Sequence, residues 1–274
     1  MPDLSATCIL YLYMDLLVDK DTELNNEVPA EPEIPANMPL LEEMMKAGLC
    51  MGKKSSKTHP RMKPLVFGKR NGIEIIDVEQ TVPFLDGAMD FVKNKIAANG
   101  NLLLVGTTPM AKDLVLALSL NLKLPHVTER WLGGTLTNFK TLSKRIAYFK
   151  KLKSDKEAGR LGKYTKKERL DFDRKIAKMS IMFGGVEDMA AVPQLLFVVD
   201  AKANSTAVRE ARRLKIPVVG IVNTDTDPEL VEYPIPANDR AKSSIEWILN
   251  RLEKAVVAGR EMAVASQKPG VVNT

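Results

Sequence analysis

Three short, uninterrupted apolar segments divide the chain, at residues 102–105, 195–199 and 218–222. Each is followed by a turn and then by a stretch whose apolar residues have helical spacing. Strands that are apolar throughout are typical of a sheet buried on both faces, and the alternation of strand and helix is typical of parallel pairing. The pattern therefore predicts an α/β protein with a parallel sheet flanked by helices.

Other patterns surround these strands. The dipeptide Asn71-Gly72, between the apolar segments 65–67 and 73–76, predicts a β-hairpin. Helical spacing predicts helices over three further stretches: 39–47 (stopped by Gly48), 81–98, and about 239–258.

Residues 136–183 interrupt the strand–helix alternation. Apolar residues recur there in steps of three and four on two segments, Phe139 to Phe149 and Phe172 to Phe183. This spacing predicts an antiparallel coiled-coil helical hairpin. Thr165 and Glu168 form a capping-box pattern that starts the return helix, and Gly184 can end it.

The α/β domain is therefore expected to comprise residues 38–135 and 184–260, with the hairpin inserted between its two parts. Residues 1–37 are acidic, rich in Pro and Asn, and without a sustained period, so we expect a flexible extension. Residues 261–274 are expected to fray. Two widely spaced cysteines favour a reduced cytoplasmic protein, and the sequence has neither a transmembrane segment nor a signal-peptide pattern.

Charge is distributed unevenly along the chain. Residues 46–70 hold eight Lys and Arg and no acid, and residues 140–178 hold fifteen against five acids, while residues 1–45 have a net charge of −9. Two local cationic zones indicate a polyanionic partner bound at defined places, although a single charged helix face is as often merely solvated. The candidate RNA-binding residues are Lys53, Lys54, Lys57, Arg61, Lys63, Lys69, Arg70, Arg130, Asn138, Lys140, Lys144 and Arg145.

No catalytic or nucleotide-binding motif is present, and the two histidines lie far apart in sequence. The alternative to a binding protein is a phosphate-ligand enzyme that uses Thr107, Asp200 and Asp225 where the strands end. The same residue types commonly cap helices and close turns, and we favour that interpretation. Trp131 beside Arg130 could stack on RNA or fill the joint between hairpin and domain, and we favour the joint.

Five motifs in one order resemble the bacterial small-subunit ribosomal protein S2 family, over about residues 40–258. They are RWLGGTLTNF (130–139), FGKRNG (67–72), GGVEDM (184–189), IPV (216–218), and VNTDTDP (222–228) running to YPIPAND (233–239). The resemblance implies a flavodoxin-like α/β domain with an inserted coiled coil. It also implies binding to small-subunit rRNA near the head–body junction and contact with ribosomal protein S1.

The chain departs from the family pattern in three places, one of which is the acidic extension of residues 1–37, which lies outside the usual pattern. The family usually has two histidines and a phenylalanine in a stretch that reads here AGLCMGK (47–53), which puts contacts of those histidines in doubt while Lys53 keeps a cation. Arg240 replaces an aspartate of the Asn-Asp-Asp pattern.

We therefore expect a structural constituent of the small ribosomal subunit that assists translation and is not an enzyme. Its expected partners are small-subunit rRNA and neighbouring ribosomal proteins including S1. We expect no cofactor, no metal, no membrane association and no stand-alone homo-oligomer. A protein–protein adaptor that uses the hairpin as a lever is a third hypothesis.

Overall fold

The computed structural model describes residues 38–267, so the predicted flexible extension at 1–37 lies outside the described residues. Its centre is a five-stranded parallel sheet with the order β5-β4-β6-β7-β8. The strands are β4 (Leu102–Val105), β5 (His126–Val127), β6 (Leu195–Val198), β7 (Val218–Val222) and β8 (Tyr233–Pro236).

The three apolar strands predicted from the sequence are confirmed, and every residue of β4, β6 and β7 is buried. The two strands that were not predicted lie at the edges of the sheet. β5 has only two residues, and β8 contains Pro234 and Pro236, which an edge position tolerates because one side of the strand needs no donor.

Alternate residues of the strands point to two separate apolar layers, which is the period expected of a strand. Leu102, Leu104 and Phe197 pack with α3 (Val78–Ala97), α4 (Pro109–Leu122) and α8 (Lys242–Gln267) on one face. Leu103, Val105 and Leu196 pack on the other face with α7 (Ser205–Arg213) and with the root of the inserted hairpin. The α/β, flavodoxin-like class is thereby confirmed.

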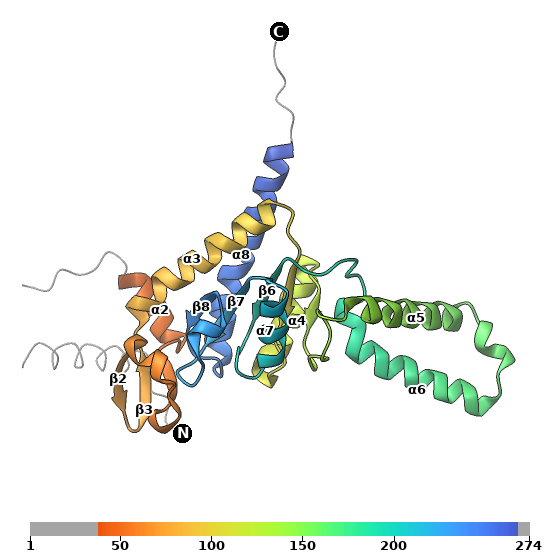
Figure 1. The fold of residues 1–274 in the computed structure, drawn as a ribbon, viewed down its shortest axis with the longest axis horizontal. Helices are drawn as coiled ribbons and strands as arrows, with labels where there is room; N and C mark the ends of the chain where they lie inside the picture. The colour runs from red at the N-terminus through yellow and green to blue at the C-terminus, as the bar shows by residue number, and fades with distance from the viewer. Residues whose placement is uncertain (1–37, 268–274) are drawn as a thin grey trace, which may run out of the picture.

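A small N-terminal lobe precedes the parallel sheet (Figure 1). It contains α2 (Met38–Lys46) and a three-stranded antiparallel sheet of order β1-β3-β2, formed by β1 (Met51–Lys54), β2 (Val66–Arg70) and β3 (Ile73–Ile76). Asn71 and Gly72 both have positive φ, at 49° and 76°, as the predicted hairpin turn requires. Two 3-10 helices, η1 (Ser55–Lys57) and η2 (Pro60–Leu65), connect β1 to β2.

The basic stretch at residues 52–64 holds almost no apolar residues, so the sequence predicts a loop that cannot pack as core, and that prediction is wrong in two respects. Its first residues form β1, which pairs with β3. In addition, the side chain of Met62 is fully buried. The pairing of β1 with β3 joins residues far apart in the chain, so no local sequence pattern predicts it.

The inserted segment forms two antiparallel helices, α5 (Phe139–Glu157) and α6 (Lys166–Phe183), which project from the body as an arm (Figure 1). A 3-10 turn, η3 (Arg160–Lys163), lies between them. The capping box of Thr165 and Glu168 is confirmed. Along the facing surfaces, Leu142, Ile146, Phe149 and Leu152 of α5 are buried, whereas α6 buries only Phe183. Coiled-coil packing along the whole arm therefore stays a prediction.

The last helix is longer than predicted. α8 extends to Gln267, so residues 261–267, which were expected to fray, are helical. Gly259 does not end the helix but allows it to approach α3, since a Cβ at this position would lie 2.7 Å from the carbonyl oxygen of Lys93. Residues 268–274 lie outside the described part of the chain.

Candidate nucleic-acid interface

The two cationic zones of the sequence lie at opposite ends of the long axis of the molecule, with the parallel sheet between them (Figure 1). One zone belongs to the N-terminal lobe and the other to the arm. A polyanion that contacts both must therefore span the body, or two separate segments of it must meet the protein.

In the lobe, five of the eight cations are exposed and form no ion pair with any described residue. We call them the lobe surface: Lys54, Lys57, Lys63, Lys69 and Arg70. The 3-10 helices fix the connection that carries the first three, because the N–H of Ser55 donates to the carbonyl of Gly72 (2.9 Å) and the N–H of His59 to that of Thr224 (2.8 Å). Lysines on an ordered backbone are suited to phosphate contact.

Lys53 is not part of this surface, although it was a candidate phosphate-binding residue. Its side chain is only 10% exposed, and its ammonium lies 2.7 Å from a carboxylate oxygen of Asp225 and 2.9 Å from one of Asp239. Burial works against the charged form, yet the two carboxylates outweigh it and raise the pKa of Lys53. The charge of Lys53 is thus used inside the protein, where it joins β1 to the ends of the parallel strands.

Arg61 is also partly engaged. Its guanidinium donates to Asp227 (2.7 Å) and lies 2.9 Å from Glu229, although half of the side chain is exposed. These carboxylates neutralise the charge that a phosphate would require.

The arm displays most of its cations to solvent. Of the fifteen Lys and Arg in 140–178, five form ion pairs: Lys150, Lys153, Lys156, Arg160 and Arg174. The three arm residues of the candidate set, Lys140, Lys144 and Arg145, are exposed and form no ion pair with a described residue. Lys140 and Lys144 are one turn apart on the side of α5 opposite its buried residues, and Lys151 continues this row two turns later. We call Lys140, Lys144, Arg145 and Lys151 the arm surface.

The segment that joins β5 to α5 is organised by a residue that sequence reasoning missed, Glu210 of α7. Glu210 is 9% exposed, and its carboxylate accepts five hydrogen bonds from residues 131–137. The donors are Trp131 Nε1 (3.1 Å), Gly134 N (2.8 Å), Leu136 N (3.1 Å), Thr137 N (3.1 Å) and Thr137 Oγ1 (3.1 Å). Burial alone would raise the pKa of the Glu210 carboxyl, but these hydrogen bonds outweigh it and the pKa is lowered.

Trp131 accordingly lies in the joint between arm and domain, as favoured above, with its ring packed in the apolar layer and its N–H on Glu210. Arg130 and Asn138, the candidates on either side, are exposed. Asn138 is the N-cap residue of α5, and its backbone N–H donates to the carbonyl of Gly134 (2.9 Å).

A second contact holds the returning end of the arm. A Cβ at Gly185 would overlap the carbonyl oxygen and the imidazole of His126, so only glycine permits this approach to β5. His126 is packed there with its Nδ1 buried and unpaired, and burial lowers its pKa. The arm is therefore attached to the body at both of its ends.

The residues that end the strands make internal contacts. Thr107 donates to Asn204 Oδ1 (2.8 Å), Asp200 accepts from the N–H of Ala203 (2.8 Å), and Asp225 pairs with Lys53 and Lys202. Burial raises the pKa of Asp200. Among residues 38–267, no group of three or more His, Cys, Asp and Glu could hold a metal ion. The turn-closing interpretation of these residues agrees with this geometry.

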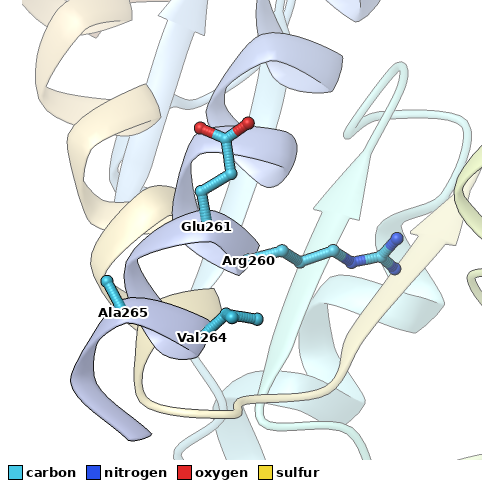
Figure 2. A pocket seen from close by; sticks show the side chains of 4 residues that line it. All are labelled: Arg260, Glu261, Val264 and Ala265. Carbon is cyan, nitrogen blue, oxygen red and sulfur yellow. The ribbon is translucent and has the colours of Figure 1, made fainter. Parts of the chain in front are cut away.

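A depression on the described surface lies elsewhere, at the end of α8, and is lined by Arg260, Glu261, Val264 and Ala265 (Figure 2). The charged groups of Arg260 and Glu261 point in different directions (Figure 2), and Arg260 donates to the carbonyl of Leu122 (2.6 Å). Nothing in this depression converges on a ligand. No helix within residues 38–267 is long and apolar enough to cross a membrane.

The chain is similar to known proteins over most of its length. The family model described as ribosomal protein S2 matches residues 44–259. A relative from Bifidobacterium animalis subsp. lactis (strain AD011), the small ribosomal subunit protein uS2, is 43% identical over 220 residues, which cover 80% of this chain and 73% of the relative. Proteins of this family are structural proteins of the ribosome and not enzymes. A match over this share of the chain, together with the five ordered motifs, shows that the chain belongs to the ribosomal protein S2 family.

Proposed function

We propose that this chain is a structural constituent of the small ribosomal subunit that binds small-subunit rRNA through two cationic surfaces held apart by a rigid α/β body. The lobe surface and the arm surface neutralise phosphates, and the parallel sheet sets the distance between them. The site of action is the cytoplasmic ribosome, where the chain supports translation without catalysing a reaction.

The observation that carries this proposal is the large number of unneutralised cations at the two ends of the molecule. Five of eight in the lobe and ten of fifteen in the arm form no ion pair with a described residue. Apolar residues of α5 are committed to the seam, so its lysines point outward. Phosphate contacts position a protein without reading sequence, and these surfaces therefore predict backbone binding and no base code.

Salt dependence of RNA binding tests the arm. Each phosphate contact contributes roughly 0.7–0.9 to the slope of log K against log salt, so the triple variant Lys140→Gln, Lys144→Gln, Arg145→Gln should lower the slope by about 2–3. The probe is an in vitro transcript of a bacterial small-subunit rRNA, and the control is Lys242→Gln with Lys254→Gln, two exposed lysines of α8. An unchanged slope in the triple variant would refute a phosphate-binding arm.

The lobe provides an internal comparison among neighbouring cations. The variant Lys54→Gln, Lys57→Gln, Lys63→Gln should lower the slope by a similar amount. Arg61→Gln should change it little, because the guanidinium is already neutralised by Asp227 and Glu229. If Arg61→Gln were as damaging as the lysine variants, the distinction between free and paired cations would be wrong.

Sedimentation tests the assignment as a whole. The full chain, expressed with a tag in its own cells, should run with small ribosomal subunits in a sucrose gradient and should be released from them by ribonuclease. A complex that resists ribonuclease would favour the adaptor hypothesis instead.

We also propose contact with neighbouring proteins of the subunit, S1 among them, in place of self-association. Support comes from α6, where Leu170 is 50% and Ile181 62% exposed on a helix that otherwise presents polar residues. Cross-linking of assembled subunits from a photoreactive residue at position 181 should capture a ribosomal protein. Capture of a second copy of this chain would contradict the proposal.

A further inference from the structure

α7 presents cations to solvent on the side opposite its buried residues. Ala207, Val208 and Ala211 face the sheet and are buried, whereas Arg209, Arg212 and Arg213 are exposed. Lys215 follows directly after the helix and is also exposed. We call these four cations the α7 surface: Arg209, Arg212, Arg213 and Lys215.

No carboxylate neutralises this surface. The four cations form no ion pair with any residue between 38 and 267, and the one acid of α7, Glu210, is fully engaged with residues 131–137. The long helices on the other face of the sheet are different, because they mix the two signs. α3 carries Asp86 and Asp90 besides its lysines, and α8 carries three glutamates besides its cations.

The α7 surface lies on the same side of the molecule as the root of the arm. α7 and the arm root pack on one face of the parallel sheet, and α3, α4 and α8 pack on the opposite face. Glu210 links α7 directly to the segment that starts at Trp131, next to the exposed Arg130. Figure 1 shows α7 between the lobe and the arm.

Cations in the last turn of a helix also stabilise it through the helix dipole, which accounts for Arg212 and Arg213. It does not account for Arg209, which lies a full turn earlier, or for an outward face without any acid. Three of the four cations are arginines, whose planar fork matches the geometry of phosphate oxygens. The buried face of α7 packs on the sheet, so the backbone that carries these guanidinium groups is held in place.

We infer that the α7 surface is a third contact with RNA, which binds phosphates between those bound by the lobe surface and the arm surface. The inference rests on the proposed function and deepens it, because it names the face of the body that the RNA covers. The opposite face, formed by α3 and α8, then points away from the RNA.

The salt slope of binding to the same rRNA transcript tests this contact. Arg209→Gln with Arg213→Gln should lower the slope by about 1.4–1.8, and should weaken binding at 0.15 M salt by about 15- to 30-fold relative to the unmodified chain. The matched control, Lys242→Gln with Lys254→Gln, removes the same charge from the opposite face and should leave the slope unchanged. Circular dichroism checks that each variant is folded.

The outcomes separate the two claims. If the α7 variant matches the control while the arm variant lowers the slope, the third contact is refuted and the proposed function stands. If neither variant differs from the control, both are refuted. If only the α7 variant lowers the slope, the α7 contact holds and the arm is not an RNA surface.

Tethered cleavage gives a second measurement that does not depend on weakened binding. An iron chelate attached at Arg213→Cys in a Cys8→Ser background should cleave the bound transcript, whereas one at Lys254→Cys should not. The remaining cysteine, Cys50, is buried and its pKa is raised to about 11, so it stays unlabelled. Equal cleavage from both positions, or cleavage from Lys254→Cys alone, would overturn the assignment of the RNA-facing side.

Discussion

The carboxylate of Glu210 joins the arm to the body, and its replacement by glutamine is expected to destabilise the protein. The two carboxylate oxygens receive five hydrogen bonds from the segment that leads into α5. A glutamine keeps one acceptor oxygen but turns an NH₂ group toward at least two of these donors. A buried donor without a partner costs about 1–3 kcal/mol, so the loss of two should lower the free energy of unfolding of Glu210→Gln by about 2–6 kcal/mol.

Urea denaturation followed by circular dichroism measures this loss, with Glu246→Gln as control because Glu246 is exposed and makes no ion pair with a described residue. Trp131 supplies a local probe. In a Trp247→Phe background it is the one remaining tryptophan, and its emission should shift to the red in Glu210→Gln because the loosened joint lets water reach the indole.

The pH dependence of the stability lost in Glu210→Gln follows from the direction of the pKa shift of Glu210. The pKa of Glu210 is lowered below its ordinary value of 4.5, so the unfolded chain binds a proton more readily than the folded one. The stabilisation is complete above the ordinary value and disappears as pH falls through the lowered pKa. The difference in free energy of unfolding between the unmodified chain and Glu210→Gln should therefore be constant near neutral pH and should become smaller in acid. A Glu210→Gln protein within about 0.5 kcal/mol of the control at pH 7 would refute the role of this residue.

Three further predictions concern residues that the fold uses internally. Lys53→Met should lower the free energy of unfolding by about 3–5 kcal/mol, because it leaves Asp225 and Asp239 without their shared cation. The salt slope of RNA binding should not change. Urea denaturation measures the first effect, and titration with the rRNA transcript measures the second. Gly259→Ala should lower stability by about 1–3 kcal/mol, because it forces α8 away from α3. Gly87→Ala has open space around its Cβ and should raise stability by about 0.5–1 kcal/mol. Thermal denaturation of the two variants compares them. The pKa of His126 is lowered by burial, so the melting temperature should fall as pH drops below about 6.5, and His126→Gln should remove that part of the dependence.

The elements that the sequence predicted best are those whose cause is local. β4, β6 and β7 are apolar throughout because both faces of each strand are covered, and this composition is visible without any knowledge of partners. The Asn71-Gly72 turn and the Thr165 capping box are likewise determined within four residues. Such features can be predicted from short windows.

The elements that were missed depend on distant residues. β1 forms in a stretch of Gly and Lys because β3 pairs with it, and Gly52 lets it approach Thr224, which lies far along the chain. The ion pairs of Lys53 could not be predicted for the same reason, because its two carboxylate partners lie beyond position 220. The network of Glu210 also spans more than seventy residues, and a single glutamate among arginines gives no sign of it.

Two buried charges of opposite sign hold the two cationic surfaces in place. Lys53 ties the lobe to the ends of the parallel strands, and Glu210 ties the arm to α7. Lys53 reaches the ends of the parallel strands and α7 packs on one face of the same sheet, so the separation of the lobe and arm surfaces is a property of the body and not of either surface. Since a bound RNA must engage both surfaces at once, loosening either joint reduces the fraction of molecules in the competent geometry and weakens binding in proportion. A substitution at Glu210 should therefore weaken RNA binding without lowering the salt slope, because it removes no phosphate contact, and this combination distinguishes a joint from a contact.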